Sequence, residues 1–213
     1  MTSAGTENSD SAVSAPDKRL TLVLIASSAG GIKALRSVIS GLPADFPAGI
    51  AIVQHLAPWH PSQLAHILGA GTRMAVKEAE EGDSLRAGVI FVAPPNKHLL
   101  VNPDETLSLS YSEMVHFLRP SADLLFESAA ASFKSRAIAV VLSGTGSDGA
   151  MGVQAIKKMG GRVISQDQST SEFFGMPLAA IETGDVDFVL PLEQIAPKLR
   201  ELIAGGSNER RAG

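Results

Sequence analysis

Short runs of β-branched and apolar residues alternate with segments of helical spacing along most of this chain. Leu20 to Ala26, for example, is a continuous apolar run, and Ile32 to Leu42 has helical spacing after a Gly-Gly turn. Fully apolar strands that alternate with helices are typical of βαβ units, in which helices cover both faces of a parallel sheet. We therefore expect an α/β protein, a three-layer α/β/α sandwich with a mostly parallel, doubly wound sheet.

The same pattern gives the expected elements in chain order. The expected strands are Leu20–Ala26, Gly49–Leu56, Val89–Ala93, Leu99–Val101, Thr106–Tyr111, Arg136–Leu142, Arg162–Gln166 and Phe188–Leu190. The expected helices are Ile32–Leu42, Ser62–Leu68, Ser121–Phe133, Gly149–Met159, Pro177–Thr183 and Glu193–Ile203. Because Thr106–Tyr111 alternates with the two-residue period of a hairpin strand, we expect an antiparallel hairpin at one edge of the sheet.

Length and composition indicate one domain. The chain has 213 residues, of which 45% are hydrophobic and only 5% aromatic, so the core is expected to consist of Ala, Val, Ile and Leu. Residues 1–18 are rich in small and polar residues without periodicity, and residues 205–213 are similar. We interpret both segments as disordered tails. The catalytic or binding domain would then span residues 19–204.

Composition also excludes several classes of function. The chain has no cysteine, which excludes disulfides, thiolate metal sites and a cysteine nucleophile. A net charge of -4 gives no basic surface for nucleic acid. No apolar run reaches the roughly 20 residues of a membrane helix, and the first residues do not form a signal peptide. We expect a cytoplasmic protein without nucleic-acid partner, membrane insertion, metal or organic cofactor.

The loop after the first expected strand reads Ser27-Ser28-Ala29-Gly30-Gly31 and runs straight into a helix. Ligands of such sheets bind beyond the carboxyl ends of the strands. A serine on a tight strand-to-helix turn would be exposed there, beside helix N–H groups that suit an oxyanion or a phosphate. The alternative is that one of the serines is simply the N-cap of the helix.

The second expected strand ends in Gln54-His55. A histidine at this position would point from the edge of the sheet into the same crevice as the serine turn. By itself, a single histidine is more often a structural or surface residue than a functional one.

The loop over residues 143–149 allows two interpretations. Gly144, Gly146 and Gly149 match the dinucleotide pattern G-x-G-x-x-G, and Asp167 follows where an acidic residue would hold a ribose. Against this, the charge of Asp148 would oppose a pyrophosphate, and too little chain follows for a full dinucleotide domain. In the alternative, the glycines allow a tight turn, and Asp148 presents its carboxylate to the crevice.

Ser28, His55 and Asp148 would then lie on three loops at one edge of the sheet. A serine hydroxyl is a poor nucleophile near neutral pH unless a neighbouring base removes its proton. Imidazole is a suitable base, and a carboxylate on its other nitrogen orients the ring and stabilises the imidazolium. This constellation therefore predicts a serine hydrolase, provided that the three side chains converge.

From Leu20 to Leu199 the chain resembles the catalytic domain of the chemotaxis receptor methylesterase (CheB) family. The matching stretches are Ile25–Gly31, Gln54–His55, Ala93–His98, Arg119–Phe126, Leu142–Gly149 and Phe174–Pro177. Each stretch is a weak signal, but together and in order they are specific.

The resemblance implies a cytoplasmic serine esterase without cofactor. Its substrates would be γ-glutamyl methyl esters on chemoreceptor signalling helices, with release of methanol, and it would also deamidate receptor glutamines. By motif, Ser28 matches the nucleophile, His55 the general base and Asp148 the orienting acid. Ser28 rather than Ser27 is the match because it stands three residues before Gly31.

The chain departs from the family at three positions, one of which is Ala26, where a glycine is common before the nucleophile turn. Ala29 stands where threonine is common, and Thr145 stands where methionine is common. The backbone N–H groups of Ala29, Gly30 and Thr145 remain candidate oxyanion donors.

Three further residues in family-like stretches are candidate substrate contacts: His98, Arg119 and Met176. Each has a structural alternative. His98 would instead bond to backbone, Arg119 would pair with Asp123, and Met176 would pack in the core.

The best-known members of the family carry an N-terminal receiver domain, and the residues before Leu20 are too few to form one. The resemblance therefore implies either constitutive activity or control by another chain, such as a separate receiver protein. Two functions remain as alternatives to the esterase: a nucleotide-binding module, and a catalytically silent module that docks on receptors.

Overall fold

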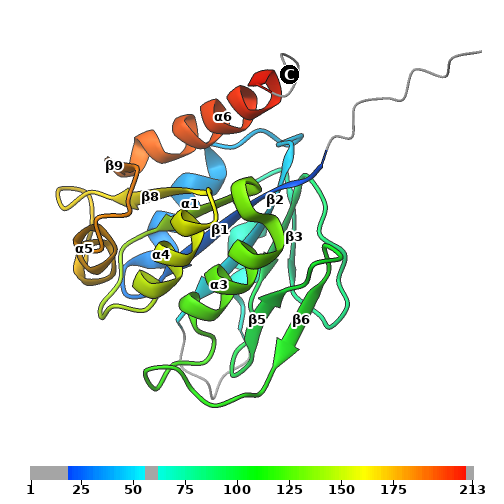
Figure 1. The fold of residues 1–213 in the computed structure, drawn as a ribbon, viewed down its shortest axis with the longest axis horizontal. Helices are drawn as coiled ribbons and strands as arrows, with labels where there is room; N and C mark the ends of the chain where they lie inside the picture. Colours follow the sequence, from blue (N-terminus) through cyan, green and yellow to red (C-terminus); the bar gives the residue numbers. More distant parts are fainter. Residues whose placement is uncertain (1–18, 56–61, 210–213) are drawn as a thin grey trace, which may run out of the picture.

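The computed structural model describes residues 19–55 and 62–209 (Figure 1). Within this part of the chain, seven parallel strands form the main sheet in the order β3-β4-β2-β1-β7-β8-β9. Their bounds are β1 (Thr21–Ser27), β2 (Ala48–Gln54), β3 (Ala75–Glu78), β4 (Val89–Val92), β7 (Ala137–Val141), β8 (Arg162–Gln166) and β9 (Phe188–Leu190). This order confirms the predicted doubly wound parallel sheet.

Helices cover both faces of the sheet, as predicted for a three-layer sandwich. One face carries α1 (Gly31–Ser40), α2 (Leu64–Gly69) and α6 (Leu192–Glu209). The other carries α3 (Ala122–Phe133), α4 (Ala150–Lys158) and α5 (Gly175–Glu182), and the short 3₁₀ helix η1 (Lys134–Arg136) follows α3.

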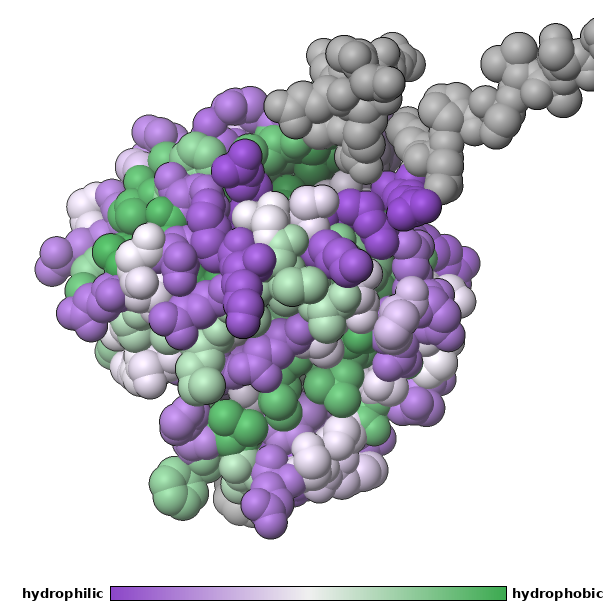
Figure 2. Space-filling model, in the orientation of Figure 1, coloured by the Kyte–Doolittle hydropathy of each residue, from purple (hydrophilic) through white to green (hydrophobic). Residues whose placement is uncertain are grey.

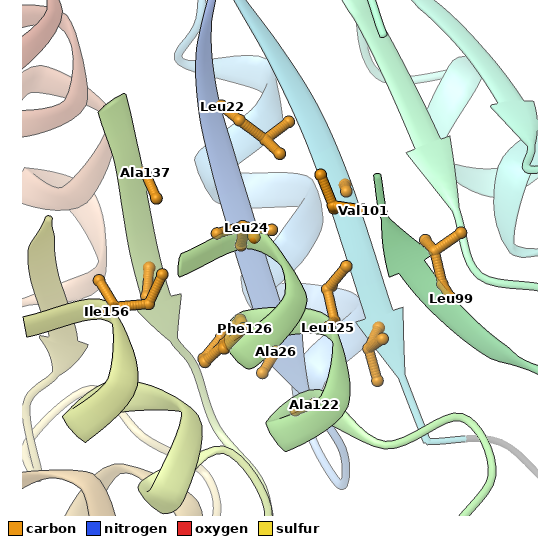
Figure 3. Close-up of a cluster of buried hydrophobic side chains, with 14 of the residues drawn as sticks. Leu22, Leu24, Ala26, Leu99, Val101, Ala122, Leu125, Phe126, Ala137 and Ile156 are labelled. Atoms are coloured by element: carbon orange, nitrogen blue, oxygen red, sulfur yellow. The ribbon is translucent and has the colours of Figure 1, made fainter. Parts of the chain in front are cut away.

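The residues of β1 explain why both faces need cover. Successive side chains of a strand point to opposite faces. Leu22 and Leu24 pack under α3 and α4, where Phe126 and Ile156 meet them (Figure 3). Ile25 packs on the opposite side, among residues of α1 and α6. A strand with apolar residues on both sides is stable only when both faces are buried, which is the three-layer arrangement.

The predicted hairpin exists, but its place in the fold differs from the prediction. Strands β5 (His98–Val101) and β6 (Leu107–Ser110) pair antiparallel and form a separate two-stranded sheet, rather than an edge of the main sheet. Leu99 and Val101 pack in the core layer under α3 (Figure 3). Burial against this helix, which alternation along the chain does not reveal, decides the position of the hairpin.

Two further boundaries differ from the sequence analysis. Strand β3 was not predicted, because a short edge strand that contains Lys77 and Glu78 has no apolar run. Helix α6 continues to Glu209, so the predicted C-terminal tail is wrong for residues 205–209. Two glycines there cost only about 1 kcal/mol each in helix propensity, and such propensities are readily overridden. Residues 1–18 and 210–213, also predicted as tails, lie outside the described residues.

The order of the central strands places the candidate functional loops together. Strand β1 lies between β2 and β7, with Ser27 opposite Gln54 and Ala26 opposite both Val53 and Val141. Because the three strands are parallel, the loops after β1, β2 and β7 leave the sheet at the same edge. Across residues 19–55 and 62–209, no helix has both the length and the apolar character of a membrane span.

Candidate active site

The turn after β1 separates the roles of its two serines. Ser27 is fully buried, and its hydroxyl donates to Gln54 Oε1 at 2.7 Å. Ser28 is partly exposed, and no hydrogen bond among the described residues uses its hydroxyl. Gly30, with φ 72°, is the N-cap of α1 and supplies no side-chain cap. The alternative interpretation of a serine N-cap is therefore wrong, and the hydroxyl of Ser28 is available for chemistry.

The side chain of Gln54 forms hydrogen bonds that link the ends of β1 and β2. Its amide Nε2 donates to the carbonyl oxygens of Ser28 at 2.8 Å and His55 at 3.0 Å. In addition, the backbone N–H of His55 donates to the carbonyl of Ser27 at 3.0 Å. The sequence analysis assigned no role to Gln54. A polar residue at the last position of a buried strand was the signal that could have indicated one.

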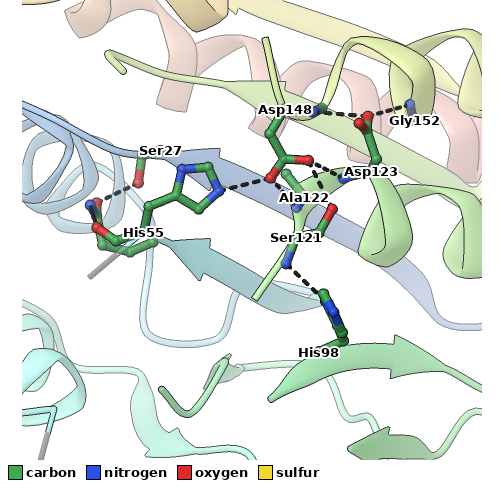
Figure 4. Close-up of polar contacts among 10 residues, drawn as sticks. Ser27, His55, His98, Ser121, Ala122, Asp123, Asp148 and Gly152 are labelled. Carbon is green, nitrogen blue, oxygen red and sulfur yellow. Dashed lines mark hydrogen bonds and ion pairs between the residues drawn. The ribbon is translucent and has the colours of Figure 1, made fainter. Parts of the chain in front are cut away.

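His55 and Asp148 form a direct pair (Figure 4). His55 Nε2 lies 2.8 Å from Asp148 Oδ2, and the two side chains are only 9% and 1% exposed. The predicted convergence of these two residues is therefore present. Since Nε2 is bonded to the carboxylate, Nδ1 is the ring nitrogen left for a nucleophile. No hydrogen bond joins Ser28 Oγ to His55 in the part of the chain that the structure describes.

The carboxylate of Asp148 lies at the N-terminus of α3. Besides His55, it accepts hydrogen bonds from Ser121 Oγ at 2.8 Å, the Ala122 N–H at 2.6 Å and the Asp123 N–H at 3.1 Å (Figure 4). Burial by itself would raise the pKa of Asp148. The hydrogen bonds from His55 and the two backbone N–H groups outweigh burial and lower the pKa below its usual value. Asp148 is therefore ionised at neutral pH.

Asp123 occupies the N-terminus of α4 in the same way. Its Oδ1 accepts hydrogen bonds from the backbone N–H groups of Gly149 at 2.9 Å and Gly152 at 2.8 Å. This is the helix terminus where the dinucleotide interpretation would put a pyrophosphate. A carboxylate already satisfies these donors and would repel a phosphate, so that interpretation of Gly144, Gly146 and Gly149 is wrong.

The loop after β7 is held against the serine turn. The backbone N–H of Ser28 donates to the carbonyl of Ser143 at 3.0 Å, and Ser143 Oγ donates to the carbonyl of Ala29 at 2.8 Å. A Cβ on Gly144 would lie 3.0 Å from Ser28 Cβ and 2.3 Å from Met176 Sδ. Glycine is therefore required at 144 for this close approach.

The candidate oxyanion donors lie on these two loops. Among the described residues, no hydrogen bond engages the backbone N–H groups of Ala29, Gly30 or Thr145. Ala29 and Gly30 stand at the start of α1, where the helix dipole favours negative charge. Their role as oxyanion donors stays a prediction.

Two of the three predicted substrate contacts are wrong. His98 is fully buried: Nδ1 accepts the Ser121 N–H at 3.1 Å, and Nε2 donates to the Glu113 carbonyl at 3.1 Å. Burial lowers the pKa of His98, consistent with the neutral ring that these bonds require. Met176 is 1% exposed and packs under Gly144. In both cases the structural alternative is confirmed.

Arg119 holds a loop together. Its guanidinium donates to Asn96 Oδ1 at 2.8 and 3.0 Å and to the carbonyls of Tyr111 and Ser112 at 3.0 and 2.9 Å. The suggested ion pair with Asp123 is wrong, because that carboxylate faces α4. Contact between Arg119 and a substrate stays a prediction.

Together, the fold and this site define a class of protein. They combine a doubly wound parallel sheet with a serine turn, a buried histidine–aspartate pair and a helix N-terminus, all at one edge. Serine hydrolases of the α/β type use these components.

Comparison with known proteins narrows the class. The sequence model of the CheB methylesterase family matches residues 23–199. Among solved structures, the crystal structure of the Thermotoga maritima CheB methylesterase catalytic domain is similar to this chain, with a TM-score of 0.83 and 39% sequence identity. The match covers 86% of this chain and 99% of that domain. The chain therefore belongs to the CheB methylesterase family.

Relatives by sequence differ in length. The chain is 46% identical to protein-glutamate methylesterase/protein-glutamine glutaminase 2 of Anaeromyxobacter dehalogenans, and 43% identical to the protein-glutamate methylesterase/protein-glutamine glutaminase of Pyrococcus horikoshii. These matches cover 86% and 87% of this chain but only 54% and 52% of the relatives. A relative from Leptospira interrogans is 44% identical over 82% of this chain and 90% of its own length.

Proposed function

We propose that this chain is a serine hydrolase that demethylates γ-glutamyl methyl esters on chemoreceptor signalling helices and releases methanol. We propose the matching deamidation of receptor glutamines as a second reaction. Family membership and the two activities in the names of its relatives support both. The observation that carries the mechanism is the buried 2.8 Å bond between His55 and Asp148, at the sheet edge where Ser28 leaves β1.

The first half of the proposed reaction forms an acyl-enzyme. Ser28 Oγ attacks the ester carbonyl while His55 Nδ1 takes its proton, because Nε2 is bonded to Asp148. The ionised Asp148 stabilises the imidazolium that results. The carbonyl oxygen gains negative charge, which the N–H groups of Ala29, Gly30 and Thr145 would stabilise.

The second half returns the enzyme to its starting state. His55 gives its proton to the departing methoxide, so methanol leaves and glutamate stays linked to Ser28 as an ester. A water molecule then attacks this ester, His55 again accepts and returns a proton, and free glutamate and the serine hydroxyl are formed. With a glutamine substrate, the same steps release ammonia in place of methanol.

Apolar side chains are exposed on segments next to the site residues in the sequence, which is consistent with a protein substrate. Large apolar side chains are exposed on the segment between β6 and α3, where Phe117 is 94% exposed, and at Met151 in the first turn of α4. Figure 2 shows hydrophobic and hydrophilic residues mixed over one face of the molecule. Exposed apolar groups of this kind are typical of protein interaction sites.

The cellular location follows from the proposed substrate. We propose that the protein works in the cytoplasm, on the cytoplasmic helices of a receptor. We further propose that a separate receiver protein controls it.

The test is methanol release from a methylated receptor fragment, measured for the wild type, Ser28→Ala and Ser27→Ala. We expect release by the wild type, loss in Ser28→Ala and a much smaller reduction in Ser27→Ala, since Ser27 is buried on Gln54. Equal release by the wild type and Ser28→Ala would remove Ser28 from the mechanism. Absence of release from the wild type, with a receiver protein added and with several receptor fragments, would contradict the proposed substrate.

A further inference from the structure

At the site, the N-termini of α3 and α4 are each capped by a carboxylate that comes from the other helix or from the turn just before it. Asp148 directly precedes the N-cap of α4, yet it accepts hydrogen bonds from the first turn of α3. Asp123 belongs to the first turn of α3, yet it accepts hydrogen bonds from Gly149 and Gly152 at the start of α4 (Figure 4). The free N–H groups and the dipole at a helix N-terminus favour an anion, so each carboxylate stabilises the other helix.

We propose that Asp123 is a positioning residue for the hydrolase reaction: by holding the first turn of α4 against α3, it keeps Asp148 aimed at His55. The proposal rests on the proposed function, because it concerns the same reaction. Asp123 itself is buried and bonds to backbone, so it acts through Asp148 and does not touch the substrate.

Neither helix supplies a side-chain cap of its own. The N-cap of α4 is Gly149, which has φ 103° and no side chain. The N-cap of α3 is Ser121, whose hydroxyl donates to Asp148 and makes no cap bond to its own helix. Removing Asp123 would therefore leave the N–H groups of Gly149 and Gly152 without their acceptor. Because Gly149 is covalently bonded to Asp148, movement of this turn moves the carboxylate.

The two helices also approach each other closely at this turn. A Cβ on Gly152 would lie 2.5 Å from Phe126 Cβ, so α4 rests directly on α3. Such close packing leaves α4 little freedom as long as Asp123 holds its end. A displacement of about 1 Å in a catalytic group can cost on the order of 100-fold in rate, so this restraint matters for the reaction.

Asp123 also adds charge to the site. Its own surroundings are the Asp148 carboxylate and the α4 backbone, and Asp148 in turn faces His55 from the end of β2 and His98 from β5. Burial, reinforced by the neighbouring Asp148, raises the pKa of Asp123 to about 6. Above that pH, Asp123 carries a negative charge in this buried site.

The experiment compares Asp123→Asn, Asp123→Ala and a matched control, Asp187→Ala, in the full chain. Asn keeps an oxygen acceptor but removes the charge, whereas Ala removes both. Asp187 is also a carboxylate that caps a backbone N–H, that of Val163 at 2.8 Å, and it pairs with Lys157 and Arg162. It lies near the beginning of β8, away from the edge that carries the site.

Three readouts separate positioning from general destabilisation. The first is the rate at which a fluorophosphonate labels Ser28, measured across pH. The second is kcat and KM for methanol release from the receptor fragment. The third is the proton NMR signal of the His55 Nε2–H that is bonded to Asp148, which does not depend on activity.

We expect Asp123→Ala to lower the labelling rate and kcat by about 10-fold to 100-fold, with KM little changed and the NMR signal shifted or lost. Asp123→Asn should lose only a few-fold in labelling rate, because it keeps an oxygen acceptor for the N–H groups of Gly149 and Gly152. Asp187→Ala should stay within about twofold of the wild type in rate.

The proposal is overturned if Asp123→Ala is labelled as fast as Asp187→Ala. If Asp123→Ala does not fold, Asp123→Asn decides the question: a labelling rate and a His55 NMR signal identical to those of the wild type would overturn the proposal. If the wild type itself is not labelled, the proposed function fails, and the NMR signal still tests the positioning of His55 and Asp148 in the variants.

Discussion

The two sides of His55 are built in opposite ways. On the Asp148 side, the carboxylate is buried and accepts four hydrogen bonds, from His55, Ser121, Ala122 and Asp123. On the Ser28 side, no hydrogen bond among the described residues uses the serine hydroxyl or the N–H groups of Ala29 and Gly30. On the Asp148 side, the folded chain itself supplies the hydrogen-bond partners. On the Ser28 side, polar groups are left without a partner among the described residues.

The difference separates orientation from chemistry. Buried polar groups must be paired, since an unpaired one costs about 1–3 kcal/mol, so the Asp148 side is rigid before any substrate arrives. Unpaired groups are tolerated only near solvent, and these are the groups that a reacting carbonyl needs. Preorganised donors of this kind avoid reorganisation during the reaction. Changes on the Ser28 side should therefore affect activity alone, whereas changes on the Asp148 side should affect activity and stability together.

The largest effect is expected for Ser28→Ala. The variant lacks the nucleophile, so methanol release should fall by about 10³-fold or more. The melting temperature should stay near that of the wild type, because no hydrogen bond of the described residues uses the hydroxyl. A marked loss of stability would show that the serine side is not as open as the comparison states.

Asp148→Asn tests the closed side. The amide keeps the shape but loses the charge that stabilises imidazolium, so the rate should fall by about 100-fold or more. Circular dichroism should show the fold intact at a lowered melting temperature, since one amide group cannot accept all four hydrogen bonds. Near-full activity in this variant would contradict the role of Asp148.

Gln54→Met tests the link between the two sides. Methionine fills a similar volume but cannot bond to Ser27 or to the carbonyls of Ser28 and His55. We expect a loss of about 1–3 kcal/mol in unfolding free energy and about 10-fold in rate. Denaturant unfolding and methanol release measure the two effects, and a change in neither would mean that the strand ends hold their positions without Gln54.

Ser121→Ala removes one of the four bonds to Asp148. Because three remain, we expect a loss of about 1 kcal/mol in stability and a few-fold in rate. Ser108→Ala, which removes a partly buried hairpin hydrogen bond to Asn102, serves as a control. If the two variants had equal activity, the hydroxyl of Ser121 would not contribute to the orientation of Asp148.

The two carboxylates should also make the stability of the protein depend on pH, with opposite signs. The pKa of Asp148 is lowered, so its contribution is present above the ordinary value of 3.8 and is lost as the pH falls further. The pKa of Asp123 is raised to about 6, so the folded state binds an extra proton and stability declines as the pH rises from about 4 to 6. Melting curves over this interval should show the decline in the wild type and not in Asp123→Asn. A decline that persists in the variant would assign it to another group.

The sequence was most informative where one physical signal decided the outcome. Apolar runs on both sides of a strand require two covering layers, so the parallel sandwich and most of its elements were predictable. The strand-end positions of Ser28, His55 and Asp148 followed from the same pattern. By contrast, the two interpretations of the loop over residues 143–149 differ in long-range contacts, and the pattern of glycines alone could not choose between them.

His98 and Asp123 show where prediction from sequence failed. His98 lies in a stretch that resembles the family, and proximity along the chain suggested a substrate contact. In the structure it is buried between Ser121 and Glu113. Asp123 is one of several carboxylates in the chain, and nothing local distinguishes it, because its partners are 26 and 29 residues away.

The sequence by itself determined the class of fold, the edge of the sheet that carries the loops, and the residue types that are available there. These depend on local periodicity and on the parallel order of strands. Only the tertiary structure decided that Gly30 rather than a serine caps α1, that the N-terminus of α4 is occupied by Asp123, and that His55 uses Nε2 for Asp148. Each is a choice among competing partners, and contacts between segments far apart in the sequence settle that choice after the chain has folded.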